Sequence, residues 1–243
     1  MDIDKIWKEA EWSSEAQQVI EGLKKFPNDS KITLLLRHSQ RNEPEIFDVD
    51  ADLSLTPEGR KIANFFGKNL PKDKRIRLFH SKAGRCKDTA EDIFNGFKEI
   101  GGDVVLKGDL LPLYHIGINL ELFLEENKKY DIFKIFNRWS AGLYSPKLWT
   151  PLIEYSQKAA DIMWENVEKA PEKTLDIHVT HDLHLLALRF GWFGIPPSKK
   201  WINYLGGFAF SFIEDKILLY NDKILTPFDI PYWWKKNKLL NSK

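Results

Sequence analysis

The chain contains 243 residues, of which 43% are hydrophobic and 29% charged, and its formal net charge is +1. A chain of this length can bury a sizeable core as one large domain or two small ones, and its balanced charge argues against a dedicated nucleic-acid binder. The chain has one cysteine, Cys86, which excludes an internal disulfide and a cysteine-only metal site. It has no signal-like N-terminus and no run of ~20 apolar residues, so we expect a soluble, cytoplasmic protein without a membrane span.

The first elements in chain order are a helix, a buried strand and a second helix. Residues 4–25 carry apolar side chains near helical spacing, and Pro27 follows them in a turn. Residues 32–36 form a short apolar run bounded by charge, which is typical of a strand buried on both faces. Thr56, followed by proline and glutamate, has the pattern of a helix start, and this helix is expected to end at Leu70.

The later elements alternate between strands and helices. We expect strands at 75–80, 104–106 and 174–180, helices at 84–97 and 182–190, and a hairpin of strands at 208–213 and 216–220. Residues 108–170 contain helical stretches around 120–139 and 153–170, and we interpret them as a helical insertion that can cap a site. The order predicts a single α/β domain over residues 1–243, a three-layer sandwich with a mostly parallel central sheet flanked by helices.

Polar clusters follow three of the predicted strands. Arg37 and His38 come directly after the first strand, Arg85 opens the helix after the second, and His181 and Asp182 follow the strand at 174–180. Ligands of open α/β sheets bind beyond the carboxyl ends of strands, so we expect these side chains to converge. Arginine forks match phosphate oxygens, and a helix start favours anions. The sequence therefore predicts a phosphate site.

Four segments resemble the histidine phosphatase superfamily. The family signature begins with an Arg-His pair after the first strand, which Arg37-His38 matches, although Ser39 stands where glycine is usual. The matching segments further along the chain are Leu55-Thr56-Pro57-Glu58-Gly59, then Ser81 with Arg85 and Thr89-Ala90, and finally His181. Together they span residues 32–220 in the family's order.

Two details are similar to the acid phosphatase and phytase branch of that family. Asp182 directly follows His181, as in the branch's His-Asp pair, and Arg41 matches its additional arginine. Pro44 arrives one residue later than in the branch motif. The closing strand pair at 206–221 also resembles this branch.

The resemblance implies a phosphatase that needs no metal or other cofactor and acts on phosphorylated small molecules. In that mechanism His38 attacks phosphorus to give a phosphohistidine, and Asp182 protonates the leaving group as general acid. The expected phosphate-binding residues are Arg37, Arg41, Arg85 and His181. We expect no nucleic-acid partner.

Several alternatives remain at the level of sequence. A phosphomutase would take its acid from the middle segment, where Glu121 and Glu125 are candidates, and a phosphate-sensing module would need no turnover. Asp182 can also serve as a helix cap. We regard a metal site as unfavourable because His178 and His181 point to opposite faces of their strand, so these two and His184 do not converge easily.

The side chain of Ser39 and the C-terminal tail are two further open points. Ser39 can narrow the pocket or form a local hydrogen bond. The tail at 232–236 mixes aromatic and basic residues, and we expect it to pack on the protein rather than to bind a partner.

Overall fold

A seven-stranded mixed sheet forms the centre of the computed structural model, which describes residues 3–43, 53–197 and 201–234. The strands are β1 (Ile32–Arg37), β2 (Arg75–His80), β3 (Val104–Asp109), β4 (Thr174–Thr180), β5 (Gly207–Ile213), β6 (Lys216–Asn221) and β7 (Ile224–Asp229). They lie side by side in the order β3-β2-β4-β1-β5-β6-β7. The first four are parallel, whereas β5, β6 and β7 pair antiparallel. The α/β class predicted from the sequence is confirmed.

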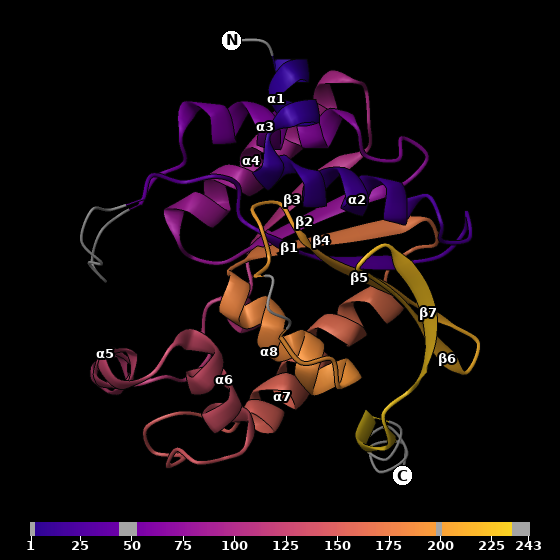
Figure 1. Cartoon of the computed structure of the whole chain (residues 1–243). Helices are drawn as coiled ribbons and strands as arrows, with labels where there is room; N and C mark the ends of the chain where they lie inside the picture. Colours follow the sequence, from indigo (N-terminus) through magenta and orange to yellow (C-terminus); the bar gives the residue numbers. More distant parts are fainter. Residues whose placement is uncertain (1–2, 44–52, 198–200, 235–243) are drawn as a thin grey trace.

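Helices cover both faces of this sheet (Figure 1). They are α1 (Ile3–Glu9), α2 (Ser14–Leu23), α3 (Pro57–Lys68), α4 (Gly84–Glu99), α5 (Leu120–Lys129), α6 (Ile132–Ser140), α7 (Leu152–Glu168) and α8 (Asp182–Phe193). In Figure 1, α1 to α4 lie on one side of the sheet and α7 and α8 on the other, with α5 and α6 beyond α8. None of the helices in the described part of the chain is long and apolar enough to cross a membrane.

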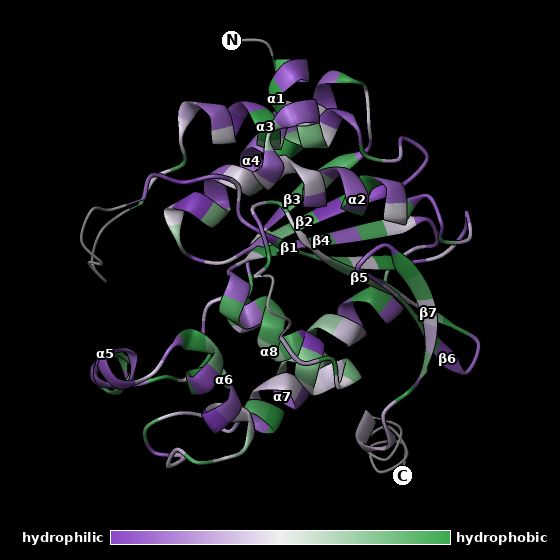
Figure 2. Cartoon of the chain, in the orientation of Figure 1, coloured by the Kyte–Doolittle hydropathy of each residue, from purple (hydrophilic) through white to green (hydrophobic). Residues whose placement is uncertain are grey.

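The side chains of β1 alternate between two hydrophobic cores. Leu34 and Leu36 pack with the core under α2, α3 and α4, whereas Leu35 belongs to the core with α7 and α8. All three are fully buried, because successive side chains of a strand point to opposite faces. This is the strand with two buried faces that the apolar run predicted. In Figure 2, hydrophobic residues follow the strands and α8, and hydrophilic residues are prominent on α1, α2 and α4.

Helices α3 and α4 approach each other closely through glycine. A Cβ atom on Gly96 would lie 1.9 Å from the backbone oxygen of Asn64, and one on Gly67 would lie 2.3 Å from that of Ile93. The capped start of α3 is as predicted, since the Thr56 side chain accepts a hydrogen bond from the Gly59 amide. This close packing fixes the position of α4, whose first turn carries Arg85.

The structure divides one predicted helix and contains one strand that was not predicted. The helix expected at 4–25 is divided into α1, a 3₁₀ turn at Glu11–Ser13 and α2, and the Ser13 hydroxyl bonds to backbone oxygens of the preceding turn. Strand β7 was not predicted. It contains Pro227, and it lies at the edge of the sheet, where proline is tolerated. In the tail, Trp234 is buried and Trp233 stacks on Trp164, while residues 235 and 236 lie outside the described residues.

Candidate active site

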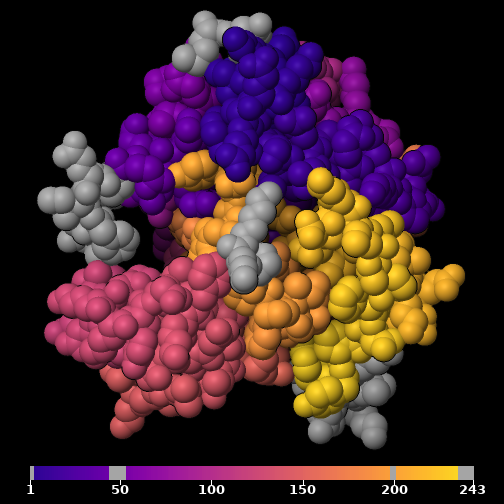
Figure 3. All heavy atoms as spheres, viewed as in Figure 1, coloured from indigo at the N-terminus to yellow at the C-terminus, as the bar shows by residue number. Residues whose placement is uncertain are grey.

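The predicted polar clusters meet at one edge of the sheet. Strands β1 and β4 are in register with Arg37 opposite Thr180, and β2 pairs with β4 so that His80 lies opposite Val179. The residues that follow these three parallel strands therefore lie close together. Figure 3 shows the surface hollowed between the purple N-terminal half and the pink middle segment, with orange residues at its floor.

His38 is a neutral imidazole with a defined tautomer. The residue is 3% exposed, and its Nδ1 lies 2.8 Å from the backbone oxygen of Ser39. A carbonyl oxygen can only accept, so Nδ1 carries the proton and Nε2 keeps its lone pair. The Nε of Arg85 donates to that Nε2 at 3.3 Å. Burial, with smaller contributions from Arg37 and Arg85, lowers the pKa of His38 to about 3.

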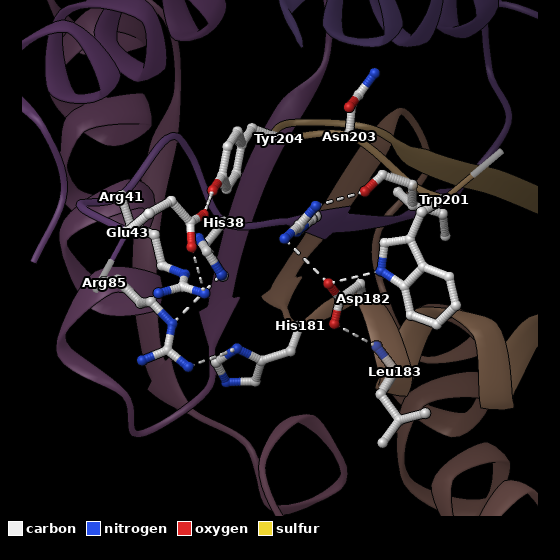
Figure 4. Close-up of polar contacts among 12 residues, drawn as sticks. His38, Arg41, Glu43, Arg85, His181, Asp182, Leu183, Trp201, Asn203 and Tyr204 are labelled. Atoms are coloured by element: carbon white, nitrogen blue, oxygen red, sulfur yellow. Dashed lines mark hydrogen bonds and ion pairs between the residues drawn. The ribbon is translucent and has the colours of Figure 1, made fainter. Parts of the chain in front are cut away.

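Arg85 lies between the two family histidines (Figure 4). Besides its bond to His38, its Nη2 lies 3.2 Å from Nδ1 of His181, which must accept because a guanidinium only donates. Nε2 of His181 then carries a proton and donates to the Ser81 hydroxyl at 3.1 Å. Burial, with nearby positive and titratable groups, also lowers the pKa of His181. The His38 and His181 rings lie edge to face, 5.5 Å apart.

Asp182 begins α8 and is held as a carboxylate. Its Oδ2 lies 3.0 Å from Nη2 of Arg37 and accepts a bond of 2.8 Å from the indole Nε1 of Trp201. Its Oδ1 accepts from the Leu183 amide at 2.8 Å. Burial alone would raise the pKa of Asp182, but Arg37 and these two donors hold it below its usual value. His181 is the N-cap residue of α8, so Asp182 occupies the first helical position.

Arg37 is directed to the side of the site that holds Asp182. Its Nη1 donates to the backbone oxygen of Ile202 at 2.6 Å, and its guanidinium lies 4.5 Å from the ring centroid of Tyr204. Arg41 pairs with Glu43 at 3.2 Å, and the other oxygen of Glu43 accepts from the Tyr204 hydroxyl. In Figure 4, Arg41 and Glu43 lie on the same side of His38 as Arg85. Glu43 thus neutralises Arg41 in this structure.

The family-like segments support the loop that carries His38. The hydroxyl of Ser39 donates to the Gly59 backbone oxygen at 2.7 Å, and its amide donates to Thr89 Oγ1 at 3.0 Å. A Cβ atom on Gly59 would lie 2.2 Å from the Gln40 backbone oxygen. Ser39 is fully buried. It therefore forms local hydrogen bonds and does not narrow the pocket.

Other titratable groups near the site do not compete as nucleophile or ligand. The Cys86 thiol lies 3.7 Å from Nε2 of His181, but burial raises its pKa to about 12, so it stays protonated. His178 is fully buried and stacked on Phe79, with ring centroids 4.7 Å apart. Within the described residues, no group of three potential ligands is placed to hold a metal ion.

The structure brings His38, Arg85 and His181 into mutual contact and pairs Arg37 with Asp182. Arg41 lies beside them but contacts Glu43. Trp201 and Tyr204 were not predicted from the sequence, because they lie between α8 and β5 in a stretch with no regular pattern. Their aromatic character near a predicted strand start was the only available signal. Pro44, the irregular member of the branch motif, lies outside the described residues.

A family model described as the histidine phosphatase superfamily (branch 1) matches residues 33–214. The sequence has no significant match among curated proteins. The match to branch 1 does not support the acid phosphatase and phytase branch that the His-Asp pair suggested. That pair is a local feature of two residues, whereas the family model weighs the whole span.

Solved structures share the fold at low sequence identity. A mycobacterial glucosyl-3-phosphoglycerate phosphatase is 14% identical, with 82% of this chain and 98% of that chain covered and a TM-score of 0.54. A phosphoserine phosphatase from Entamoeba histolytica is 18% identical, with 83% and 98% covered and a TM-score of 0.51. YhfR of Bacillus stearothermophilus is 20% identical, with 82% and 95% covered and a TM-score of 0.52.

Proposed function

Because the chain belongs to the histidine phosphatase superfamily, we propose that it hydrolyses phosphomonoesters through a phosphohistidine intermediate on His38. The observation that carries this proposal is the pair of hydrogen bonds on the His38 ring. The Ser39 carbonyl fixes the proton on Nδ1, and Nε2 presents its lone pair beside Arg85. A neutral imidazole with a lowered pKa remains nucleophilic in mildly acidic solution.

In the first step Nε2 of His38 attacks phosphorus, and the bond from phosphorus to the leaving oxygen breaks as the N–P bond forms. Arg85 is the proposed main ligand of the equatorial oxygens, since its guanidinium already lies between His38 and His181 and can turn toward a phosphoryl oxygen. Water then attacks the phosphohistidine and gives its proton to Asp182, which now acts as base; the N–P bond breaks, so that phosphate is released and His38 is regenerated. Arg37, Arg41 and His181 are proposed as further phosphate-binding groups.

Asp182 is the proposed general acid, and its environment sets a condition on that role. It must carry a proton when the leaving oxygen departs, yet Arg37, Trp201 and the Leu183 amide stabilise its ionised form. A bound phosphate dianion would compete for Arg37 and repel the carboxylate, and both effects raise the pKa of Asp182. The acid therefore forms on substrate binding in this mechanism.

The structure gives little support to the alternative functions. A phosphomutase would need its acid from the middle segment, but Glu121 and Glu125 are exposed on α5 and have no hydrogen bond or ion pair with the site residues in the described part of the chain. A binding module needs neither a nucleophilic imidazole nor a carboxylate beside it. Hydrolysis uses both, so the phosphatase is the function that the geometry favours.

The test is hydrolysis of 4-nitrophenyl phosphate by the full chain, with EDTA present, between about pH 4 and 8. We expect turnover in the wild type, its loss in His38→Ala and its retention in His115→Ala, whose side chain is exposed. A folded wild type without turnover contradicts the proposal, as does a His38→Ala variant that keeps the activity. Activity lost with EDTA and restored by zinc would replace it with a metal-dependent mechanism.

Small phosphorylated metabolites are the first substrates to screen. Two proteins of the same fold are named for hydrolysing glucosyl-3-phosphoglycerate and phosphoserine. A library of sugar, inositol, nucleotide and amino-acid phosphates, with phosphoproteins as a further class, would identify the preferred leaving group. Selectivity between these classes is measured as the ratio of kcat/KM values.

A further inference from the structure

Glu43 is a carboxylate at the candidate active site to which the proposed mechanism gives no role. Its Oε2 lies 3.2 Å from Nη2 of Arg41, and its Oε1 accepts a hydrogen bond from the Tyr204 hydroxyl. Figure 4 shows the carboxylate between these two partners. The side chain is 62% exposed, yet both of its oxygens are bonded. Glu43 is therefore held from two sides.

The backbone brings Arg41 and Glu43 together. Arg41 forms an isolated antiparallel β-bridge with Leu55, and the amide of Asn42 donates to the backbone oxygen of Ser54 at 3.0 Å. Side chains two positions apart in an extended segment point to the same face. The paired segment therefore favours an ion pair between Arg41 and Glu43 in the folded chain.

Tyr204, the second partner of Glu43, is fixed beside Arg37 and His38. The centroid of its ring lies 4.5 Å from the guanidinium carbon of Arg37 and 5.8 Å from the centroid of the His38 ring. The next residue, Leu205, is fully buried, and its amide donates to the Arg37 backbone oxygen at 3.2 Å. Burial, with the bond to Glu43, raises the pKa of Tyr204 to about 12, so its hydroxyl remains the donor.

Two of the arginines proposed to bind phosphate thus already have a carboxylate partner. Arg37 pairs with Asp182, and Arg41 pairs with Glu43. The proposed mechanism uses Asp182 to transfer a proton, whereas it requires no proton transfer of Glu43. A phosphoryl group that binds Arg41 must either take the place of the Glu43 carboxylate or bind beside its negative charge. Both arrangements weaken the binding of a phosphate dianion.

We propose that Glu43 competes with phosphate for Arg41 and so limits the affinity of the site for inorganic phosphate, the product of the reaction. The assignment of Arg41 as a phosphate ligand rests on the proposed function. The competition acts on substrate and product alike, because both present phosphoryl oxygens to the same guanidinium. It therefore changes KM and the affinity for product without lowering the barrier of the chemical step. Glu43 determines binding and is not a catalytic residue.

The experiment is isothermal titration of inorganic phosphate into the full chain carrying His38→Ala, with and without Glu43→Gln. We expect Glu43→Gln to tighten phosphate binding by about three- to tenfold, the range for loss of one exposed ion pair and one hydrogen bond. A damaged site would bind phosphate more weakly, so a gain in affinity does not arise from misfolding. Glu21→Gln is the matched control, because it removes the same charge from a similarly exposed pair with Lys24 on α2. Affinity that is unchanged or weaker in Glu43→Gln, an equal gain in the control, or phosphate that binds none of these variants overturns the proposal.

Arg41→Gln identifies the group for which Glu43 competes. When Arg41 is absent, Glu43→Gln should change the affinity for phosphate by less than about twofold, because the two side chains act as a pair. A gain of the same size with and without Arg41 would mean that the carboxylate only repels phosphate from a distance. That result overturns the competition.

Steady-state kinetics connect the binding to turnover. In the chain that retains His38, Glu43→Gln should lower KM for 4-nitrophenyl phosphate and the inhibition constant of inorganic phosphate by the same factor, with no rise in kcat. A rise in kcat at unchanged KM contradicts a role in binding. A wild type that binds phosphate but hydrolyses no ester contradicts the proposed function, whereas the titrations still decide whether Glu43 competes for Arg41.

Discussion

The hydrogen bond from Trp201 to Asp182 gives the sharpest test of the proposed general acid. Trp201→Phe removes the indole N–H and keeps an aromatic ring in the same place. The lost bond, 2.8 Å long, stabilises the ionised carboxylate, so its removal raises the pKa of Asp182 toward the range in which an acid catalyst works.

The magnitude follows from the geometry of this bond. A hydrogen bond to a charged group contributes about 1.5–3 kcal/mol, and the lower end applies because the Asp182 side chain is 27% exposed. Since about 1.4 kcal/mol is a tenfold change in an equilibrium constant, loss of the bond should favour the protonated form of Asp182 by about tenfold and so raise its pKa. The protonated form then persists to higher pH, so the fall of the rate on the alkaline side moves to higher pH.

The assay compares a poor and a good leaving group across the pH range. For an alkyl phosphate, kcat/KM on the falling limb should increase by about tenfold in Trp201→Phe, because the protonated acid is about tenfold more populated at a given pH. For 4-nitrophenyl phosphate, which leaves without a proton, little change is expected. Trp12→Phe is the matched control, since Trp12 lies near Tyr204 and has no contact with Asp182 among the described residues.

Two results would refute this reasoning. Equal loss of both activities would mean that Trp201 only supports the fold. An unshifted pH profile for the alkyl phosphate, or a shift that persists when Asp182→Asn is added to Trp201→Phe, would remove Asp182 from the general-acid role.

Three further predictions concern the site and the fold. Arg85→Lys should lower kcat/KM by about a hundredfold or more, because a lysine ammonium cannot bond His38 and His181 at the same time as the guanidinium does. The exposed Lys87→Ala should retain activity. Burial lowers the pKa of His178 to about 3, so this residue destabilises the fold as the pH falls below its unfolded pKa of about 6.5. In urea unfolding, the free energy of unfolding of His178→Phe relative to wild type should therefore rise by about 2 kcal/mol between pH 6.5 and 5. The exposed His115→Gln should show no such rise. Gly96→Ala should lower stability by about 1–3 kcal/mol and reduce kcat, because its Cβ would collide with the backbone of α3 and shift α4; a thermal melt with near-wild-type Tm contradicts this.

The sequence alone determined the local features of the site. The apolar run of β1, the cap at Thr56 and the strand β4 each depend on residues within a few positions, and the structure has them where they were predicted. Because parallel strands end at one edge, the positions of Arg85 and His181 near each other also followed, although they are 96 residues apart.

Tertiary structure alone decided how those side chains are partnered. Arg37 is held by the backbone oxygen of Ile202, 165 residues away, and Asp182 by the indole of Trp201. No local periodicity encodes these contacts, because they depend on where the strand order places the segment before β5. The chemistry of each residue can be read from the sequence, but the charge state of Asp182 depends on neighbours that only the folded chain assembles.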